Sequence, residues 1–408
     1  MKSESHSVYD VIVIGGGIVG TSTAMQLMAT GDYSILLIEK ELEFAYHQTG
    51  NNSGVIHSGV YYKPGSLKAK MCVEGNRSMV KYCIENNIPH DICGKVVVAT
   101  KEEQLNTLQE LTERGKVNGI EGIEYCDSIA LKQIEPFVNG IAGIYVPSTG
   151  IVDYKAVTNS FVQKYLEYGG EISTAAEVKK ISDKGNYYEI TTNKGCFLSR
   201  AVINCAGLYS DKITELFGLE SGVKIIPFRG EYFTLSESAR SKVKNLIYPV
   251  PDSRFPFLGV HFTRMIHSGV EVGPNAVLAF AREGYTKQTL NFAELAETLL
   301  YKGFRMMARK YLIPGLKEMF RSFSKQAFLE SAQELIPSLS NKDLQPGGAG
   351  VRAQAVDKSG KLVDDFVFAE HKSGSKYVLN VVNAPSPAAT ASLEIGKTIC
   401  SKVVSNLS

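Results

Sequence analysis

The chain has 408 residues, of which 44% are hydrophobic and 21% are charged, and its formal net charge at pH 7 is +2. This composition is ordinary for a globular protein. The length exceeds what one hydrophobic core usually supports, so we expect two domains or one large domain with insertions. A net charge so close to zero excludes an overall field that would attract nucleic acid.

The seven cysteines form no C-x-x-C pair and their number is odd. This pattern favours reduced thiols over a disulfide framework and indicates no metal site. No stretch approaches the roughly 18 apolar residues that a transmembrane helix needs, and the first residues lack the apolar core of a secretory signal. We therefore expect a cytoplasmic protein.

A glycine motif follows the first predicted strand, which is the apolar run over residues 11–14. Gly15, Gly17 and Gly20 have the G-x-G-x-x-G spacing. In that order they suit a tight turn, a close approach of the backbone to a pyrophosphate, and tight packing of a helix on the sheet. The helix predicted over residues 18–30 then directs its N-terminal N–H groups at the phosphates.

A second apolar run over residues 35–38 ends at Glu39, 19 positions after Gly20. A carboxylate at this place binds the ribose hydroxyls and disfavours NADP, because it repels a 2′-phosphate. The strand, glycines, helix, strand and glutamate together predict an ADP-containing dinucleotide, against the alternative of a glycine turn that binds nothing. They do not distinguish FAD from NAD.

The segment from 45 to 62 is rich in small and amide side chains, which favours a loop that contacts the cofactor over a plain surface loop. A more β-like stretch from 228 to 280 predicts a substrate domain on an antiparallel sheet. Other predicted elements are helices over residues 67–87, 102–118 and 154–168 and strands over residues 95–99, 144–146, 177–181, 187–192 and 201–206.

Residues 293–325 have helical spacing of apolar residues, and Pro314 with Gly315 predicts a break into two helices. Between residues 302 and 325 there are seven lysines or arginines and one acid, Glu318, interleaved with phenylalanine and methionine. This pattern resembles a membrane-surface helix pair. The alternative is a solvated cationic face over a core stripe.

The last part of the chain predicts a glycine-rich turn over residues 347–352, a buried strand over 377–382 and a helix that ends near 404. A strand followed by small residues and a helix N-terminus again suits a phosphate or the edge of a flavin. The dinucleotide domain is therefore expected to be interrupted by the substrate domain and completed by this last segment.

Several blocks of sequence carry a family resemblance. The glycine motif and residues 52–59, 204–207 and 350–352 resemble the FAD-dependent oxidoreductases of the D-amino-acid oxidase superfamily. Within that superfamily, five further blocks resemble the L-2-hydroxyglutarate oxidase (dehydrogenase) family. They are residues 57–62, 228–232, 258–263, 272–276 and 383–390. The joint occurrence of these later blocks, in order along nearly the whole chain, is the specific part of the likeness.

The resemblance implies FAD, and we expect it to be noncovalent because no cysteine is obviously placed for attachment. It also implies oxidation of a dicarboxylate, L-2-hydroxyglutarate, to 2-oxoglutarate, with electrons passed to quinone or oxygen. Some members are membrane-associated, which would give residues 293–325 a purpose as a peripheral contact on the inner face of the membrane. The alternatives are a flavin oxidase of an amino acid or glycerol 3-phosphate, an NAD-dependent dehydrogenase, and a non-catalytic ADP-binding module.

Oxidation of a 2-hydroxy acid needs a base for the hydroxyl proton, and neutral histidine titrates near working pH. His57 is the first candidate, and His261 is a substrate contact or the alternative base. Arg352 and Arg229 are the first candidates for binding the substrate carboxylates, since arginine binds carboxylates bidentately. We expect the cofactor to be bound by Gly15, Gly17, Ile18, Val19, Gly20, Glu39, Lys40, Asn51, Ser53, Gly54, Val178, Ala206, Gly207, Gly350, Arg352, Ala384, Ser386 and Ala388.

The predicted fold is α/β (α+β overall), with a Rossmann-like FAD-binding domain that is discontinuous in sequence and a substrate domain on a mainly antiparallel sheet. We assign residues 1–90, 145–225 and 335–408 to the FAD-binding domain. Residues 91–144 and 226–334 form the expected substrate domain.

Overall fold

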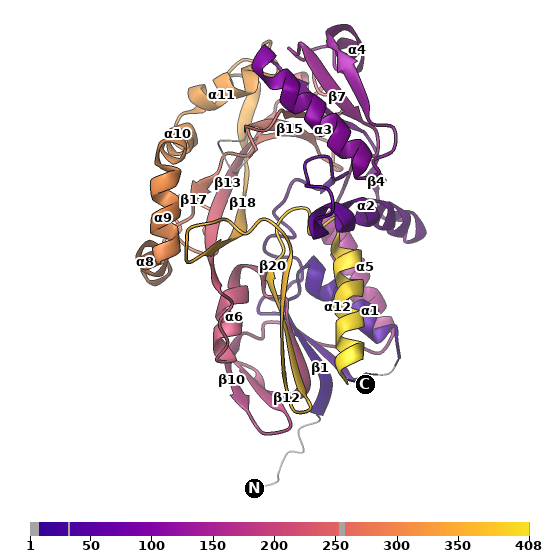
Figure 1. Cartoon of the computed structure of the whole chain (residues 1–408), viewed down its shortest axis with the longest axis vertical. Helices are drawn as coiled ribbons and strands as arrows, with labels where there is room; N and C mark the ends of the chain where they lie inside the picture. Colours follow the sequence, from indigo (N-terminus) through magenta and orange to yellow (C-terminus); the bar gives the residue numbers. More distant parts are fainter. Residues whose placement is uncertain (1–7, 32, 253–257, 408) are drawn as a thin grey trace. The chain divides into compact units, whose positions relative to one another are not determined.

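The computed structural model describes residues 8–31, 33–252 and 258–407 (Figure 1). The chain forms two compact units, each discontinuous in sequence. Unit 1 consists of Met1–Gly50, Tyr154–Ile226 and Ala353–Ser408, and unit 2 of Asn51–Asp153 and Pro227–Arg352. Residues 51–90, 145–153 and 335–352, which we had assigned to the FAD-binding domain, lie in unit 2.

Unit 1 is built around one mixed sheet of eight strands. Its strands are β1 (Val8–Ile14), β2 (Ile35–Ile38), β9 (Glu171–Ser173), β10 (Val178–Asp183), β11 (Tyr188–Thr192), β12 (Gly195–Asn204), β19 (Val367–Ser373) and β20 (Lys376–Asn383). Its helices are α1 (Ile18–Met28), α5 (Tyr154–Glu167), α6 (Ser210–Leu216) and α12 (Ser392–Leu407).

The centre of this sheet is parallel. Val13 of β1 pairs with Ile203 of β12 on one side and with Leu37 of β2 on the other. β20 lies parallel to β12 on its far side, and β9 lies parallel to β2. Because neighbouring parallel strands end at the same edge, the loops after β1, β2, β12 and β20 meet there, which is where open α/β sheets bind ligands.

Helix α1 packs on this sheet between α5 and α12. Ser22 donates a hydrogen bond to the carbonyl oxygen of Ser392 at 2.9 Å. A Cβ atom at Gly396 would lie 2.5 Å from Gln26 Nε2, so the glycine permits the close approach of α12 to α1. The last helix of the chain is therefore part of the layer that supports the glycine motif.

Unit 2 is built around a nine-stranded, mostly antiparallel sheet and a small three-stranded sheet. Its strands are β3 (Val55–Ile56), β4 (His90–Asp91), β5 (Lys95–Ala99), β6 (Glu124–Asp127), β7 (Ala142–Val146), β8 (Gly150–Val152), β13 (Val223–Leu235), β14 (Leu246–Pro249), β15 (His261–Arg264), β16 (Val270–Gly273), β17 (Val277–Leu278) and β18 (Leu344–Asp357), of which β13 and β18 cross the unit boundaries. Its helices are α2 (Leu67–Glu85), α3 (Leu105–Val117), α4 (Ser128–Ile134), α7 (Glu237–Arg240), α8 (Phe292–Leu300), α9 (Lys302–Lys310), α10 (Leu312–Phe323) and α11 (Lys325–Gln333). The α/β fold and the mainly antiparallel second sheet confirm the predicted fold class.

One face of the large sheet in unit 2 packs into an apolar core. Val96, Ile247, Phe262 and Val272 lie on neighbouring strands and pack into a core with α11, including Phe328. Because side chains alternate between the two faces of a strand, the residues next to these four in sequence occupy the opposite face. That opposite face carries most of the polar residues described below.

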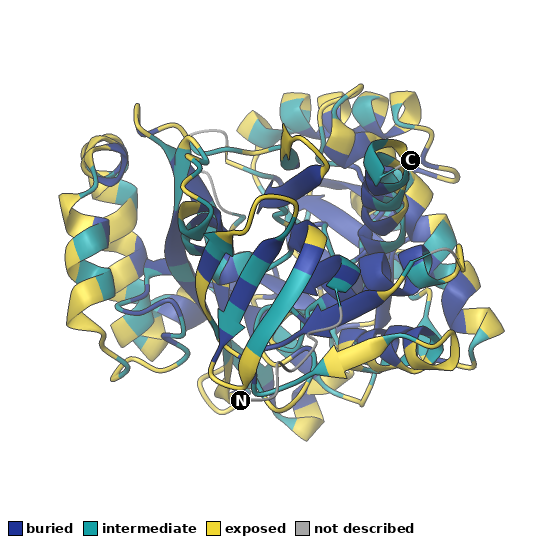
Figure 2. Ribbon diagram, turned by 90° about the horizontal axis from the view of Figure 1, so that it is seen from below, coloured by how far each residue is buried: buried dark blue, intermediate teal, exposed yellow. Residues whose placement is uncertain are grey.

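The segment predicted as two helices contains three, and the expected break at Pro314 and Gly315 is wrong. The breaks fall at Tyr301 and Tyr311, and Pro314 lies in the first turn of α10. Proline is tolerated there because the first N–H groups of a helix have no partner within the helix. Figure 2 shows exposed faces along the helices at its left, where α8–α10 lie.

α10 is unusual in exposing a row of large apolar side chains. Phe320 and Phe323 are 67% and 74% exposed, and Leu316 and Leu312 continue the row one and two turns earlier. We call these four residues the α10 face. Among the described residues, no helix has the length and hydropathy needed to cross a bilayer.

The turn predicted over residues 347–352 is also wrong, because these residues lie within β18, which pairs with β13. A Cβ atom at Gly347 would lie 2.7 Å from the carbonyl oxygen of Tyr232. The glycines therefore serve a close approach between two strands, a use of glycine that sequence does not distinguish from a turn.

Candidate active site

The glycine motif forms the turn from β1 into α1 as predicted. Gly15 has a φ of +113°, and a Cβ atom there would lie 2.4 Å from the carbonyl oxygen of Cys205. A Cβ atom at Gly20 would lie 1.9 Å from the carbonyl oxygen of Gly15. α1 begins at Ile18 after Gly17, and the N–H of Ile18 donates to Thr49 Oγ1 at 3.0 Å. The N-terminal end of the helix, where dinucleotide folds hold their phosphates, is therefore at this turn.

The other loops of unit 1 that we predicted to bind the cofactor follow the neighbouring parallel strands. Ala206 and Gly207 come directly after β12, and the N–H of Cys205 donates to the carbonyl oxygen of Ile14 at 2.8 Å, beside Gly15. Ala384, Ser386 and Ala388 follow β20 and precede α12. Val178 begins β10, farther from this edge in strand order.

Glu39 follows β2, is 9% exposed and approaches the glycine turn directly. Its Oε2 accepts a hydrogen bond from the N–H of Gly16 at 2.6 Å, and its Oε1 accepts one from the N–H of Glu41 at 2.8 Å. A carboxylate beside the glycine turn is where a dinucleotide fold binds ribose. The residues present therefore fit the ADP end of FAD.

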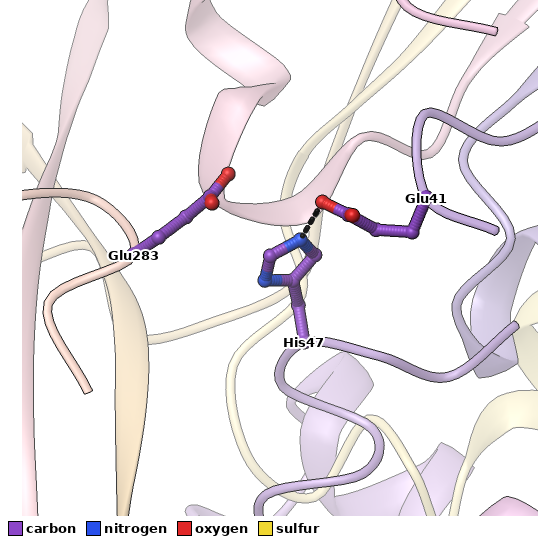
Figure 3. Close-up of side chains that lie close together, drawn as sticks. All are labelled: Glu41, His47 and Glu283. Carbon is purple, nitrogen blue, oxygen red and sulfur yellow. Dashed lines mark hydrogen bonds and ion pairs between the residues drawn. The ribbon is translucent and has the colours of Figure 1, made fainter. Parts of the chain in front are cut away.

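A charged cluster adjoins Glu39. Glu41 forms an ion pair with Lys40, and its Oε1 lies 2.9 Å from His47 Nε2 (Figure 3). Burial raises the pKa of Glu41, but the hydrogen bonds from Lys40 and His47 outweigh it and leave the pKa below its usual value. Lys40 also lies over the ring of Tyr209, with Nζ 5.5 Å from its centroid.

The remaining predicted cofactor residues, Asn51, Ser53, Gly54, Gly350 and Arg352, belong to unit 2. Two of them come together, because a Cβ atom at Gly350 would lie 2.3 Å from the carbonyl oxygen of Asn51. Gly54 has a φ of +68° and approaches Val152 closely. These glycines therefore hold backbone segments together.

The two candidate histidines come together in unit 2, although 204 positions separate them in the sequence. His261 is buried at the start of β15, opposite Tyr248 of β14, and their ring centroids are 4.0 Å apart. His57 keeps part of its surface accessible, and its carbonyl oxygen accepts a hydrogen bond from Asn76 Nδ2 at 3.1 Å. A positive charge on His261 would lower the pKa of His57, so the two rings are close enough to influence each other.

The tautomer of His261 follows from its neighbour. Nδ1 lies 2.8 Å from the carbonyl oxygen of Gly259, which can only accept, so Nδ1 carries the proton. Burial lowers the pKa of His261 to about 3, so the ring is neutral at pH 7. Nε2 of the neutral ring therefore has a lone pair that can accept a proton.

Positive charges surround the histidine pair. Burial lowers the pKa of His57 to about 3, and the charges of Lys95, Lys68 and Arg352 act in the same direction. Arg352 acts on His261 as well. A site with three cations beside two neutral bases is built to receive an anion.

The polar face of the sheet adds tyrosines and one acid to this site. Tyr61 and Tyr248 stack with centroids 6.5 Å apart, and the Tyr61 hydroxyl is buried without a hydrogen-bond partner in the structure. Tyr232 interacts with Arg352, and burial raises its pKa. Burial also raises the pKa of Glu271 to about 7, so this carboxyl is partly protonated near neutral pH.

Arg229, the second predicted substrate anchor, has its charge neutralised by another residue. Its Nη2 lies 3.0 Å from Glu231 Oε1, and its Nη1 donates to the carbonyl oxygen of Thr286 at 2.9 Å. The side chain is 4% exposed. This geometry favours a structural role for Arg229 and leaves Arg352 as the better placed of the two.

The sequence reasoning missed Lys95. It opens a strand whose five residues are all buried, and it is 1% exposed. A lysine inside an apolar run predicted as a strand was the available signal, because lysine is almost never fully buried without a partner.

All seven cysteines are free in the structure. Burial raises the pKa of Cys72 and of Cys205 to about 12, and that of Cys93 to about 11. Thiols with such pKa values stay protonated and are poor nucleophiles.

A parallel sheet with a dinucleotide-type glycine turn, and a second sheet with neutral histidines among cations, define a flavin- or nicotinamide-dependent oxidoreductase. Residues 10–401 match the family model described as DAO, FAD dependent oxidoreductase. The chain is 54% identical over 394 residues to L-2-hydroxyglutarate dehydrogenase from Indibacter alkaliphilus, covering 96% of this chain and 98% of that protein. It is 48% identical over 398 residues to the Escherichia coli (strain K12) protein of the same name, covering 97% and 93%.

The chain therefore belongs to the FAD-dependent oxidoreductase family, and within it to the family of these L-2-hydroxyglutarate dehydrogenases. Its fold is similar to that of an FAD-bound L-α-glycerophosphate oxidase from Mycoplasma pneumoniae, with a TM-score of 0.78 at 22% identity, covering 98% of this chain and 95% of that one. The predicted family and the predicted cofactor, FAD, are confirmed.

Proposed function

We infer that the protein is an FAD-dependent L-2-hydroxyglutarate dehydrogenase, which oxidises L-2-hydroxyglutarate to 2-oxoglutarate and passes the electrons to an acceptor. The observation that carries this inference is the cation-lined histidine pair of unit 2 in a chain 54% identical to an enzyme of that name. The substrate is a dianion, and the site offers positive charge and neutral bases together.

Bound FAD supplies the acceptor for the hydride that leaves C2 of the substrate. We propose that unit 1 is the FAD-binding domain and unit 2 the substrate domain. The glycine turn from Gly15 to Gly20, the Glu39 carboxylate and the loops after β12 and β20 would hold the ADP end. Asn51, Ser53, Gly54 and Gly350 remain proposed as further cofactor contacts.

A histidine of unit 2 takes the hydroxyl proton in this proposal. The hydrogen bond to Gly259 leaves His261 Nε2 as a proton acceptor, which supports His261. His57 remains the alternative, and its accessible surface lets a ligand reach it. A bound dianion would raise the pKa of both histidines, because its negative charge opposes the lowering by Lys95 and Arg352.

Arg352 is proposed to bind the carboxylate next to the hydroxyl carbon. Arg352 is an exposed residue, and its charge acts on both histidines. Bidentate binding by arginine would fix the orientation of C2 relative to the base.

FAD is proposed to be noncovalent. The raised pKa values of Cys72, Cys93 and Cys205 keep these thiols protonated, which disfavours a thioether link. Acid precipitation should release all flavin into the supernatant. Yellow colour that stays with the precipitate would contradict this.

We propose that the α10 face touches an anionic membrane surface from the cytoplasmic side, which would suit a quinone as the acceptor. The exposed apolar row lies on a segment with seven lysines or arginines. Among the described residues, Lys302, Arg305, Arg309, Lys310 and Lys317 have no carboxylate partner, so their charges are available to lipid head groups.

The test of the activity is anaerobic reduction of the purified holoenzyme by substrate. L-2-Hydroxyglutarate should bleach the flavin absorbance, and D-2-hydroxyglutarate, glycerol 3-phosphate and amino acids should not. Bleaching by one of the latter, with none by L-2-hydroxyglutarate, would overturn the proposed function. Titration of the reduced enzyme with a quinone analogue or oxygen then identifies the acceptor.

A further inference from the structure

Lys95 is a buried cation without a countercharge. It is 1% exposed at the start of β5, and its Nζ lies 4.7 Å from the ring centroid of Tyr61 and 5.2 Å from that of Tyr248. Among the described residues no carboxylate forms an ion pair with it. Within the part of the chain that the structure describes, the acidic group that acts on its charge is the Cys72 thiol, which is itself held protonated.

A second buried lysine in the same chain shows what a structural lysine looks like. Lys376 is 3% exposed, and its Nζ lies 4.8 Å from the ring centroid of Tyr188. It also forms an ion pair with Asp183. Lys376 and Lys95 therefore have similar burial and the same kind of aromatic contact. They differ because Lys376 is paired with a carboxylate and Lys95 is not.

Among the described residues, none accepts a hydrogen bond from the Lys95 ammonium group. The ring of Tyr61 lies under the ammonium group, and the hydroxyl of Tyr61 is buried and has no hydrogen-bond partner in the structure. Burying an unpaired charge and an unpaired hydroxyl in one place is costly. One carboxylate from a ligand could accept from both groups, so the two unsatisfied groups point to the same kind of ligand.

The proposed substrate has two carboxylates, and the position of Lys95 relative to the histidines suggests which of them Lys95 would bind. Leu246 pairs with Lys95 across β14 and β5, and β14 pairs with β15, which begins at His261. Lys95 and His261 thus belong to strands two positions apart, about 10 Å between backbones. The charge of Arg352 acts on both histidines, so a second cation of unit 2 faces the same pair of bases.

We propose that Lys95, with the Tyr61 hydroxyl, binds the carboxylate of the substrate that is remote from the hydroxyl carbon, and so selects a dicarboxylate over a monocarboxylate. This assignment rests on the proposed function. Arg352 and Lys95 would then hold the two ends of the substrate, with the hydroxyl carbon nearer the histidines.

The test compares L-2-hydroxyglutarate with L-2-hydroxypentanoate, which has the same five-carbon chain and a methyl group in place of the remote carboxylate. In the holoenzyme, Lys95→Met should raise the KM for L-2-hydroxyglutarate by about 10- to 100-fold, the loss expected for one charged hydrogen bond. The kcat/KM for L-2-hydroxypentanoate, which has no remote carboxylate for Lys95 to bind, should fall much less, so that the preference for the dicarboxylate decreases. Tyr61→Phe should raise the KM for the dicarboxylate by roughly 3- to 10-fold.

Lys376→Met is the matched control and should leave the preference between the two substrates as in the wild type. Lys95→Met should be at least as resistant to urea as the wild type without ligand, because it removes an unpaired buried charge. A structural lysine would instead lower the resistance. The proposal is overturned if Lys95→Met and Lys95→Gln both lower kcat/KM by the same factor for the two substrates, because the preference for the dicarboxylate is then unchanged.

Calorimetric titration of the oxidised holoenzyme with glutarate, which has no hydroxyl group to oxidise, separates this proposal from the function. Wild-type enzyme should bind glutarate more tightly than Lys95→Met does, by about the same factor as the change in KM. If glutarate binding depends on Lys95 but L-2-hydroxyglutarate is not oxidised, the proposed function fails and the role of Lys95 stands. Equal glutarate affinity in wild type, Lys95→Met and Tyr61→Phe would overturn the role of Lys95 even in an active dehydrogenase.

Discussion

His261 and Tyr248 face one another on the neighbouring strands β15 and β14, with ring centroids 4.0 Å apart and ring planes inclined by 35°. This contact and the Nδ1 hydrogen bond to Gly259 fix the imidazole on both its face and its edge. A base that is held in this way needs little reorganisation when a substrate hydroxyl arrives.

The first prediction ranks His261 and His57 by their contribution to the rate of flavin reduction. His261→Asn should lower the anaerobic rate of flavin reduction by about 100-fold or more, the usual contribution of a general base. His57→Asn should have a smaller effect on that rate. Stopped-flow absorbance at saturating L-2-hydroxyglutarate measures both, and the opposite ranking would give the role of base to His57.

The second prediction concerns stability and pH. The pKa of each histidine is about 3 in the folded protein, below its usual 6.5. Between these values the unfolded chain binds protons that the folded protein does not, so the free energy of unfolding falls as the pH falls from about 6.5. Each histidine contributes up to about 1.4 kcal/mol per pH unit.

Urea denaturation at several pH values between 6.5 and 4.5 measures this slope. The double variant His57→Asn/His261→Asn should have a clearly shallower slope than the wild type, because other titrating groups are common to both proteins. His371→Asn, at an exposed position of β19, should keep the wild-type slope. Parallel curves for wild type and double variant would rule out neutral buried histidines.

The third prediction tests the ribose contact. Glu39→Arg places a cation beside Gly16 and removes the acceptor of its N–H, so FAD retention should weaken by at least about tenfold. The ratio of flavin to protein after dialysis measures this. Glu41→Gln changes a neighbouring carboxylate outside the proposed contact set and should retain flavin. Full flavin content in Glu39→Arg would contradict the assignment of Glu39 to the ribose.

The fourth prediction tests the α10 face. Leu316→Ser/Phe320→Ser/Phe323→Ser should abolish co-sedimentation with phosphatidylglycerol vesicles and leave the anaerobic reduction rate unchanged. Val117→Ser/Ile129→Ser removes two other highly exposed apolar side chains of unit 2 and should bind like the wild type. Arg305→Gln/Arg309→Gln/Lys317→Gln should weaken binding most at low salt. The membrane contact would be refuted if the wild-type protein stayed in the supernatant when the vesicles were sedimented.

The local elements of the fold were largely predictable because their signals are local. The strand over residues 95–99 and the helix that begins at residue 67 were predicted from runs and periodicity alone, and the structure confirms them. Pro314 misled because proline breaks a helix interior but suits a first turn, and the first turn is set by where the preceding helix ends. The glycines of β18 misled because close strand packing and a turn both select glycine.

The candidate site was predictable only in part because its side chains meet through the register of distant strands. His57 and His261 were chosen one by one, from the chemistry of their side chains. The sequence around each residue does not show that Lys95 lies two strands from His261, or that Glu231 neutralises the charge of Arg229. Whether a charged side chain has a countercharge depends on which residues lie beside it in the fold, and the spacing of residues in the sequence does not reveal this.

The sheet of unit 1 has a consequence for biosynthesis. β1 is made before the other strands of this sheet. β12 (Gly195–Asn204) follows much later in the sequence, and β20 (Lys376–Asn383), which pairs with β12 on the other side, is the last strand of the sheet to be made. Until then the edge of β12 has unpaired N–H and C=O groups that can pair with another nascent chain. We expect flavin insertion to be a post-translational event, and ribosome-bound chains stalled before residue 376 to depend on chaperones for solubility.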